Sequence, residues 1–400
     1  MHRRNRHILN ILLKRAKMFP ALGVLGPRQV GKSTFLMKEW RDAMNAVYLT
    51  FDKQEIALRA KRSPEQLLQD ESDGQKIHLI IDEAQKVPHI FDSIKAMIDE
   101  NRRVGSFTLS GSVEFSSKSG VRESLAGRMG NTRLYPMTLR ELNDHEFVSP
   151  WVKLNFASQK TLLKSKSVET WLERGGMPIF CSISDRDERI SSINSWLEAI
   201  CFRDLIQLKG ADYDSELAFN LLKTIAQQSD SPMSMLSLEE LGGSAASIKK
   251  HLSALEALFL IYEIPSFENP KGHSMFKIFD AGVINALLGG QETLNSRQAC
   301  LVTLLINEIY AQYEYAGKSK PKLSYFRSRG GAELDLILKV NNEIIGLECS
   351  TSIDISPYRL RGMKSFLRKY PDATGYIIAP VLEAYRVEKN ILVIPWNSIG

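Results

Sequence analysis

The sequence of 400 residues predicts an α/β protein built from three parts. A glycine-rich turn, Gly26–Thr34, lies between a short apolar run and a helical pattern. Apolar runs then alternate with helical patterns up to about residue 148, which is typical of a parallel sheet covered by helices. Helical spacing dominates from about residue 150, and a second α/β pattern follows. We therefore expect domains at residues 1–148, 149–290 and 291–400.

The glycine-rich turn matches the phosphate-binding loop pattern GxxxxGK followed by Ser or Thr. Ala21–Leu25 before it predicts a buried strand, and Thr34–Arg41 after it predicts a helix. Such a turn directs several backbone N–H groups and a helix N-terminus at one small volume, which suits a phosphate. Expected nucleotide-binding residues are Gly26, Pro27, Arg28, Gln29, Val30, Gly31, Lys32, Ser33 and Thr34. We expect Lys32 to reach the β- and γ-phosphates of ATP and Ser33 to hold Mg²⁺.

A second apolar run, Ile77–Glu83, ends in two acids. The run predicts a parallel strand buried on both faces, so Asp82 and Glu83 would lie at the carboxyl edge of the sheet. Asp82 is the expected partner of Ser33 at Mg²⁺, and Glu83 is the expected base that polarises the attacking water. An acidic cap at the end of a strand is the plainer alternative. The adjacent acid pair is typical of the additional-strand class of P-loop ATPases.

Two further segments could complete such a site. Ser106–Ser112 predicts a strand whose Ser110 or Ser112 could contact water or the γ-phosphate, although a simple turn fits equally. Arg128, with Arg122 nearby, could stabilise the transferring phosphoryl charge on its own or a neighbouring chain. Surface arginines are common, so an ordinary exposed side chain is the alternative for Arg128.

Composition constrains the class of protein. The first twenty residues hold six basic and no acidic residues, which accounts for the whole net charge of +6. Nucleic acid binding would therefore depend on that segment or on a local patch. The four cysteines form no metal-binding pattern, which favours reduced thiols and a cytoplasmic protein. No stretch is long and apolar enough to predict a membrane span.

The middle region has the pattern of a winged helix. Helices are expected at Ser195–Leu208, Ser215–Gln228, Ser237–Leu241 and Ser244–Leu258, followed by strands at Ile261–Ile264 and Met275–Phe279. Lys249 and Lys250 would lie on the exposed face of the last of these helices and could contact DNA. The alternative is a packing or oligomerisation module whose lysines are simply solvated.

Two carboxylates in the last part suggest a degenerate nuclease site. Asp335 and Glu348 fall on neighbouring expected strands, Glu333–Leu338 and Glu343–Ser350, and could hold a divalent metal. In the restriction-endonuclease-like pattern D…ExK the last position is lysine, whereas this chain has Ser350. Lys364 on a following helix is a candidate replacement. A domain retained for binding or structure is favoured.

The chain resembles prokaryotic AAA-type ATPases with a C-terminal domain of unknown function, in which a winged helix precedes a restriction-endonuclease-like domain. The resembling stretches are Gly26–Thr34, Leu79–Pro88, Leu109–Ser112, Ser124–Leu142, Leu172–Pro178, Phe202–Leu205, Phe279–Gly289 and Phe326–Leu338. The resemblance implies ATP binding through Gly26–Thr34 with Asp82 and Glu83. It also makes roles for Arg128 and Arg203 near the nucleotide or a domain interface more plausible.

The expected function is an ATP-binding and ATP-hydrolysing switch or remodelling protein that acts on DNA or on a protein. The expected partners are ATP with Mg²⁺, DNA through the winged helix, and other copies of the chain, but no membrane. Two alternatives remain open: an ATP-licensed, metal-dependent nuclease, and a non-catalytic DNA-binding regulator.

Overall fold

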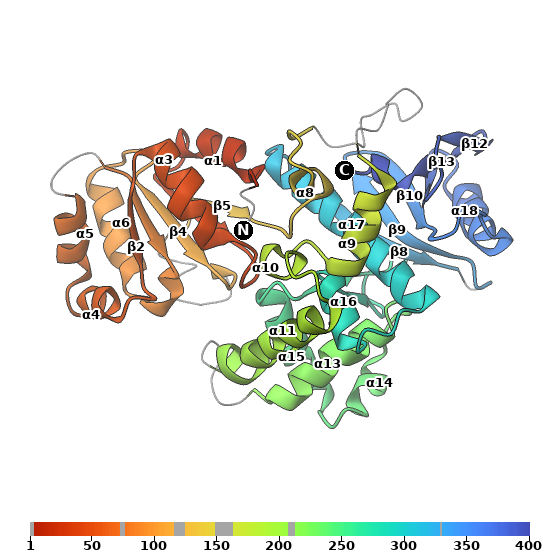
Figure 1. Ribbon diagram of the computed structural model, residues 1–400, viewed down its shortest axis with the longest axis horizontal. Coiled ribbons are helices and arrows are strands. Elements are labelled where there is room, and N and C mark those ends of the chain that lie inside the picture. The colour runs from red at the N-terminus through yellow and green to blue at the C-terminus, as the bar shows by residue number, and fades with distance from the viewer. Residues whose placement is uncertain (1–3, 73–76, 116–124, 149–162, 207–212, 329) are drawn as a thin grey trace. The chain divides into compact units, whose positions relative to one another are not determined.

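The computed structural model describes residues 4–72, 77–115, 125–148, 163–206, 213–328 and 330–400 (Figure 1). The chain forms two compact units. The first comprises Met1–Tyr135 together with two short later segments, Ala257–Phe259 and Glu314–Lys318. The second comprises Pro136–Glu256, Leu260–Tyr313 and Ser319–Gly400. The three domain ranges expected from the sequence stay a prediction, because the two compact units have other boundaries than those ranges.

The first unit contains a parallel five-stranded sheet of order β2-β3-β4-β1-β5. Its strands are β1 (Ala21–Leu25), β2 (Val47–Thr50), β3 (Leu79–Asp82), β4 (Phe107–Gly111) and β5 (Met129–Arg133). Strands β1, β3 and β4 are fully buried, as the apolar runs in their sequences require. Strand β4 lies between β1, which precedes the glycine-rich loop, and β3, which ends in Asp82.

Helices cover both faces of this sheet (Figure 1). One face packs on α4 (Gln54–Arg62), α5 (Pro64–Ser72) and α6 (Ile90–Glu100) through one apolar cluster. The other face carries α1 (Ile8–Ala16) and a helical run formed by α2 (Lys32–Phe35), the π-helical η1 (Leu36–Trp40) and α3 (Arg41–Met44). Trp40 of that run is buried and donates a 2.9 Å hydrogen bond to Thr108 of β4. A short 3₁₀ turn, η2 (Ala84–Lys86), follows β3.

A residue distant in sequence completes the core of the first unit. Phe259 is 5% exposed and belongs to the same apolar cluster as Ile81 and Phe91. Its ring lies under the Arg133 guanidinium, with the Arg133 Cζ 4.6 Å from the ring centroid. Phe259 has a φ of 63°, in the left-handed region that side chains rarely adopt. The backbone therefore accepts strain to place this ring in the core.

The helical part of the second unit follows the expected order. It contains α8 (Leu139–Leu142), α9 (Ser165–Arg174), α10 (Pro178–Cys181), α11 (Arg186–Ala199), η6 (Ile200–Asp204), α13 (Ser215–Gln227), α14 (Met235–Glu239), α15 (Ala245–Ala257), α16 (Ala281–Leu287) and α17 (Leu294–Tyr315). The predicted hairpin is present as antiparallel β6 (Ile261–Ile264) and β7 (Met275–Ile278). Every residue of β7 is buried, whereas Glu263 of β6 and much of the loop joining the two strands are exposed.

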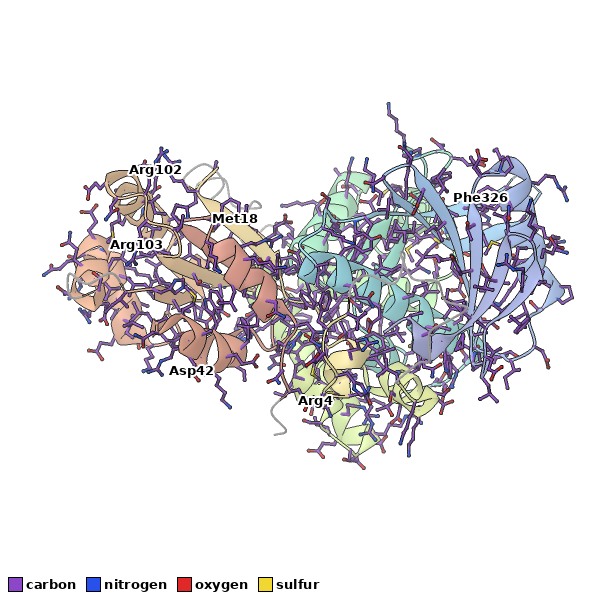
Figure 2. The ribbon with its side chains drawn as sticks, turned by 90° about the horizontal axis from the view of Figure 1, so that it is seen from above. Arg4, Met18, Asp42, Arg102, Arg103 and Phe326 are labelled. Carbon is purple, nitrogen blue, oxygen red and sulfur yellow. The ribbon has the colours of Figure 1, made fainter. Side chains whose placement is uncertain are left out.

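The second unit also contains a mixed six-stranded sheet of order β12-β13-β11-β10-β9-β8. Its strands are β8 (Lys322–Arg327), β9 (Glu333–Val340), β10 (Glu343–Cys349), β11 (Thr374–Ala379), β12 (Tyr385–Glu388) and β13 (Ile391–Pro395). Helix α18 (Pro357–Lys369) packs on β9, β10 and β11, and Phe326 of β8 lies in the shared core (Figure 2). The chain ends in η7 (Trp396–Ser398).

Several sequence expectations differ from the structure in detail. The helix expected at Ser195–Leu208 instead begins at Arg186, because Asp185 caps the first turn by accepting from the Glu188 N–H at 2.8 Å. The charged segment 61–76 forms the end of α4 and all of α5 in its described part. Strand β12 was missed, because its residues are mostly exposed and carry no apolar pattern. None of the described helices is long and apolar enough to cross a bilayer.

Candidate functional site

The glycine-rich loop has the backbone of a phosphate cradle. Gly31 has a φ of 100° and precedes α2, and Gln29 has a φ of 64°. A Cβ added to Gly26 would lie 2.4 Å from the carbonyl oxygen of Leu134, so only glycine fits there. The Lys32 ammonium donates to the carbonyl oxygens of Gly26 and Pro27 at 2.8 and 2.9 Å. Lys32 is thus folded back across the loop that it is expected to serve.

A buried arginine from the N-terminal segment supports this loop. The Arg6 guanidinium donates to the carbonyl oxygen of Val30 at 2.9 Å and to that of Tyr135 at 2.7 Å. Arg6 is 7% exposed, and its backbone N–H donates to Glu39 at 3.2 Å. The basic N-terminal segment is therefore partly structural, which the charge count alone did not reveal. Arg3 of the same segment lies outside the described residues.

The two residues expected at Mg²⁺ share a tyrosine. The Tyr48 hydroxyl donates to Asp82 Oδ2 at 2.6 Å, and the Ser33 side chain lies near that hydroxyl. Ser110 donates to Asp82 Oδ1, so both carboxylate oxygens of this buried acid are held. Burial, with the Asp82 charge second, raises the pKa of Tyr48, which keeps its proton. The structure therefore brings Ser33 and Asp82 together around Tyr48, a residue that sequence reasoning missed.

Glu83 lies next to this cluster and in a strained conformation. Its φ is 56°, in the left-handed region, and its backbone N–H donates to Ser110 Oγ at 3.3 Å. Burial is the main cause that raises the pKa of Glu83, while the Lys32 charge acts in the opposite direction. Gln85 donates to the Glu83 carboxylate and, at 3.3 Å, to Ser112 Oγ. Strain at a partly buried acid of this kind is common at functional sites.

Lys32, Asp82 and Glu83 also interact through their charges. Burial lowers the pKa of Lys32, and the nearby carboxylates of Glu83 and Asp82 act against that shift. A basic amine, two carboxylates and a serine hydroxyl thus converge at the carboxyl ends of β1 and β3. This donor set fits a triphosphate with an oxygen-preferring cation such as Mg²⁺. When bound, that cation would supply charge stabilisation at the phosphates.

Arg128 and Arg133 lie at opposite ends of β5. Arg128 precedes β5, and its guanidinium makes two hydrogen bonds to Asp99, at 2.7 and 2.9 Å. Met129 pairs with Ala21 at the start of β1, so Arg128 is at the amino edge of the sheet, away from the loop that follows Leu25. This position argues against a role at the nucleotide of its own chain, and a role toward a neighbouring copy stays a prediction. Arg122 lies outside the described residues.

Arg133, which sequence reasoning did not single out, lies at the carboxyl end of β5. It pairs with Leu25, the residue directly before the phosphate loop. Its guanidinium carbon is 4.6 Å from the ring centroids of both Tyr135 and Phe259. The signal was available, because Arg133 falls in the resembling stretch Ser124–Leu142. An arginine at that end of a closing strand shares an edge with the phosphate loop.

Comparisons with known proteins agree with this architecture. Residues 18–143 match the family described as AAA domain, and residues 299–399 match a domain of unknown function, DUF4143. Residues 165–294 match a second domain of unknown function, DUF8612. The chain therefore carries an N-terminal AAA-type P-loop ATPase domain and a C-terminal domain of unknown function. Its AAA domain contains the complete cluster described above.

Relatives and solved structures similar to this AAA-type chain give no function for it. The uncharacterized proteins Rv2008c of Mycobacterium tuberculosis and Mb2031c of Mycobacterium bovis are each 24% identical over 389 residues, covering 95% of this chain and 81% of theirs. The Walker-type ATPase PABY2304 of Pyrococcus abyssi is 15% identical with a TM-score of 0.46, covering 70% of this chain and 94% of its own. DnaA from Aquifex aeolicus bound to AMPPCP is 11% identical with a TM-score of 0.25, covering 62% and 85%.

In the C-terminal part of this AAA-type chain, the structure brings the expected carboxylates together. The backbone N–H of Asp335 donates to Glu348 at 3.2 Å, and Arg359 lies 2.5 Å from Glu348 Oε1. Lys364 does not replace the lysine missing at position 350, because it pairs with Glu388 at 2.6 Å. Lys277 of β7, far away in sequence, lines the cavity next to these carboxylates instead.

The lysines expected to contact DNA are both exposed on α15. The Lys250 ammonium lies 4.2 Å from the ring centroid of Tyr213. His251 beside it is buried, and its Nε2 accepts from the Asp214 N–H at 3.0 Å. The helix thus has one packed and one exposed face, but these lysines are only two charges. DNA contact through Lys249 and Lys250 stays a prediction.

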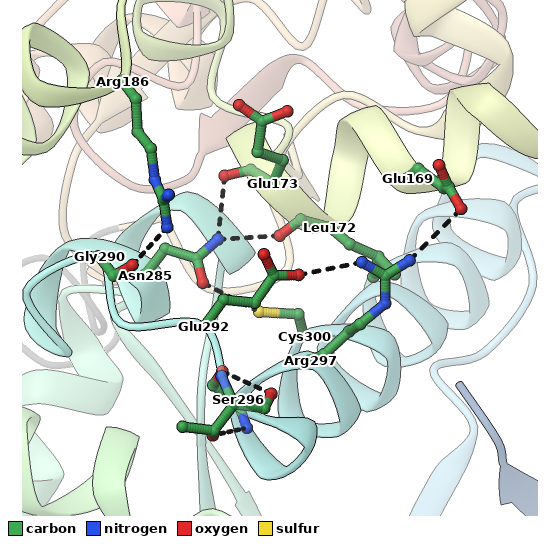
Figure 3. Close-up of polar contacts among 11 residues, drawn as sticks. Glu169, Leu172, Glu173, Arg186, Asn285, Gly290, Glu292, Ser296, Arg297 and Cys300 are labelled. Atoms are coloured by element: carbon green, nitrogen blue, oxygen red, sulfur yellow. Dashed lines mark hydrogen bonds and ion pairs between the residues drawn. The ribbon is translucent and has the colours of Figure 1, made fainter. Parts of the chain in front are cut away.

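Two of the resembling stretches, Leu172–Pro178 and Phe279–Gly289, form a structural joint. Asn285 donates to the carbonyl oxygens of Leu172 and Glu173, both at 2.9 Å (Figure 3). Asp280 accepts from the Gly176 N–H at 2.7 Å, and a Cβ on Gly175 would lie 2.0 Å from that carboxylate. Close packing explains these motifs without a ligand. Cys300 beside the joint is buried, which raises the pKa of its thiol and leaves it unreactive.

Proposed function

We propose that the chain binds ATP with Mg²⁺ and hydrolyses it, and that the nucleotide state switches the chain between two arrangements. The observation that supports this most is that Tyr48 and Ser110 hold both carboxylate oxygens of the buried Asp82, with Ser33 of the phosphate loop nearby. An incidental glycine-rich turn would not place its serine beside an acid held in this way at the end of another strand. The charge interaction of Lys32 with both acids adds to this support.

Each side chain has a distinct role in the proposal. The loop Gly26–Thr34 binds the phosphates through backbone N–H groups, and Lys32 turns from the Gly26 and Pro27 carbonyl oxygens toward them. Ser33 and Asp82 hold the metal, directly or through water. Glu83 accepts the proton of the attacking water, and its raised pKa brings it closer to the working pH. Gln85 orients the Glu83 carboxylate through their hydrogen bond.

ATP turnover by purified protein tests the enzymatic part. Lys32→Ala should weaken ATP binding, whereas Glu83→Gln should retain binding and lose turnover by at least about a hundredfold, since general base catalysis contributes that much. Glu65→Gln, an exposed acid on α5 of the same unit, is the matched control and should behave as wild type. Wild-type turnover in both site variants would refute the proposal.

The finer part of the proposal is that the switch acts on DNA through α15. Support comes from the exposed positions of Lys249 and Lys250 and from the order of three helices and a hairpin. Affinity for duplex DNA should then fall steeply with salt and change with the bound nucleotide. The double variant Lys249→Ala, Lys250→Ala should lose affinity for DNA and show a weaker salt dependence. Lys389→Ala, at an exposed position between β12 and β13, should change neither. Binding that ignores these lysines would leave the ATPase proposal standing without a DNA partner.

A further inference from the structure

Three residues from the second half of the chain are packed into the first unit. Ala257–Phe259 belong to the first compact unit, whereas Glu256 before them and Leu260 after them belong to the second. All three are buried, with exposed fractions of 7%, 6% and 5%. We call Ala257–Phe259 the inserted segment. The chain thus enters and leaves the first unit within three residues.

The inserted segment is hydrogen bonded to the loop that follows β4. The Glu114 N–H donates to the Ala257 carbonyl oxygen at 3.0 Å. Two residues before Glu114, the Ser112 hydroxyl oxygen accepts from Gln85, which also donates to Glu83. The end of α15 is therefore connected through one short loop to the residue that we expect to activate water.

A second contact joins the inserted segment to the end of β5. The Phe259 ring lies beneath the Arg133 guanidinium, and Arg133 pairs in the sheet with Leu25, the residue directly before the phosphate loop. Leu25 and Phe259 also belong to the same apolar cluster. The Leu134 N–H donates to the Leu25 carbonyl oxygen at 2.7 Å, which holds the end of β5 against the start of the phosphate loop. The inserted segment therefore contacts two structures that border the expected nucleotide site.

The residues that flank the inserted segment are fixed in the second unit. The Leu260 N–H donates to the Leu255 carbonyl oxygen at 3.0 Å, and the Leu260 carbonyl oxygen accepts from the Phe279 N–H at 3.1 Å. Ala257 is itself the last residue of α15. Because so few residues lie between these bonds and Phe259, a movement of Phe259 must shift the end of α15 or break one of the two hydrogen bonds.

The backbone of Phe259 gives the inserted segment two alternatives. Its φ of 63° is a conformation that a phenylalanine keeps only where its surroundings hold it there. Packing in the core and the contact with Arg133 favour this seated position of the ring. Withdrawal of the ring would relieve the backbone but lose the packing. Because these effects oppose each other, a change at the contacts of the segment can shift its population between the two positions.

We propose that the inserted segment transmits the nucleotide state of the first unit to α15 and β6. This inference rests on the proposed ATP site. Phosphates bound at Gly26–Thr34 order the phosphate loop and the adjoining end of β5, and a γ-phosphate contact with Ser112 orders the loop after β4. Both contacts of the inserted segment then hold Phe259 in its seated position. By linkage, a ligand whose binding displaces the end of α15 weakens ATP binding to the same degree.

Hydrogen–deuterium exchange of the full-length chain tests this proposal, with and without Mg²⁺ and the ATP analogue AMPPNP. Bound analogue should slow exchange in the phosphate loop and also in residues 245–264, which cover α15 and β6. We expect slowing in residues 245–264 of at least about fivefold, the lower end of ordinary coupling between two sites. If the phosphate loop were slowed and residues 245–264 were unchanged, the coupling would be refuted and the ATP site would stand. Slowing in neither region would overturn both proposals.

Variants of the second contact, measured at saturating analogue, separate coupling from simple packing. Phe259→Leu keeps an apolar side chain in the core but removes the ring beneath Arg133, so the slowing in residues 245–264 should be lost while that of the phosphate loop remains. Phe326→Leu, a matched change in the core of the six-stranded sheet, should retain both. Arg133→Met should also lose the slowing in residues 245–264, and Arg133→Lys should restore it, because an ammonium likewise interacts with a ring face. Unchanged slowing in both Phe259→Leu and Arg133→Met would overturn the proposal.

Discussion

The Tyr48 hydroxyl donates a 2.6 Å hydrogen bond to Asp82 Oδ2, across the gap between neighbouring strands β2 and β3. Thr50 at the end of β2 pairs with Asp82 in the sheet, whereas Tyr48 pairs with Ile80. The Tyr48 side chain therefore extends along the strands toward their carboxyl ends to contact Asp82. The Ser33 side chain lies near the same hydroxyl. Tyr48 is thus positioned to fix both side chains that we expect to hold Mg²⁺.

Tyr48→Phe should therefore weaken the response to Mg²⁺ without unfolding the chain. Loss of the hydroxyl frees Asp82 on one side, although Ser110 still holds its other oxygen. We expect the Mg²⁺ concentration for half-maximal ATP turnover to rise by about tenfold, as for other groups that orient metal ligands. Tyr385→Phe, at an exposed position of β12, serves as control. An unchanged Mg²⁺ dependence would mean that Tyr48 has no positioning role.

Arg6→Met should loosen the phosphate loop from behind. The substitution removes the donors to the carbonyl oxygens of Val30 and Tyr135, which are both buried positions. If ordering the loop on ATP binding costs about 1.4 kcal/mol more in the variant, ATP binding becomes tenfold weaker. Fluorescent-nucleotide titration would measure it. Lys14→Ala removes an exposed charge from the same basic segment and should leave the affinity unchanged, which separates support of the loop from general electrostatics.

Glu308 should make the second unit less stable as pH rises. This buried acid accepts from the Leu139 N–H at 2.6 Å, and burial raises its pKa to about 7. The folded chain therefore holds the proton more tightly than the unfolded chain, whose Glu308 titrates near the ordinary value of 4.5. Its contribution to stability is fully present below pH 4.5 and is lost as pH rises to about 7.

Glu308→Gln stays neutral and should escape that loss. The stability of wild type relative to this variant should fall by up to about 3 kcal/mol between pH 4.5 and 7.5. Urea unfolding at several pH values measures the difference. A constant difference across this range would show that Glu308 titrates normally in the folded chain. Glu169→Gln removes an acid on α9 that is about half exposed and is the control.

Phe259 offers a test of strain against packing. Phe259→Ala removes a ring from the core of the first unit and should cost about 3–5 kcal/mol of unfolding free energy. Because φ is 63° there, Phe259→Gly should be more stable than Phe259→Ala by about 1 kcal/mol. Elsewhere in a chain glycine is usually the worse replacement. If alanine proved better than glycine at this position, the left-handed conformation would be wrong.

Local patterns predicted the AAA part well. The phosphate loop, the strand before it and the acids at the end of β3 all follow from short stretches whose chemistry depends on neighbours in sequence. The strands β1, β3 and β4 were likewise predicted to within a few residues, because each is buried along its whole length. The exposed strand β12 carries no such pattern and was missed.

The side chains that complete the site could not be predicted in this way. Arg6 acts on Val30 and Tyr135, and Tyr48 acts on Asp82, through contacts that exist only once the sheet is paired in register. Lys277 was overlooked for the same reason, since its approach to the Asp335 cavity depends on tertiary packing. Sequence spacing directed attention to Lys364 instead, and that lysine pairs with Glu388.

The first compact unit borrows residues from two places far down the chain. Phe259 fills its core, and Glu314 binds Arg15 at 2.8 Å beside Tyr315, whose hydroxyl accepts from the Tyr135 N–H at 3.2 Å. A truncated product that stops near residue 148 would leave an apolar hollow and orphan these groups. Recombination between relatives faces the same constraint. An N-terminal region moved into another chain should fold well only if the segments Ala257–Phe259 and Glu314–Lys318 are moved with it.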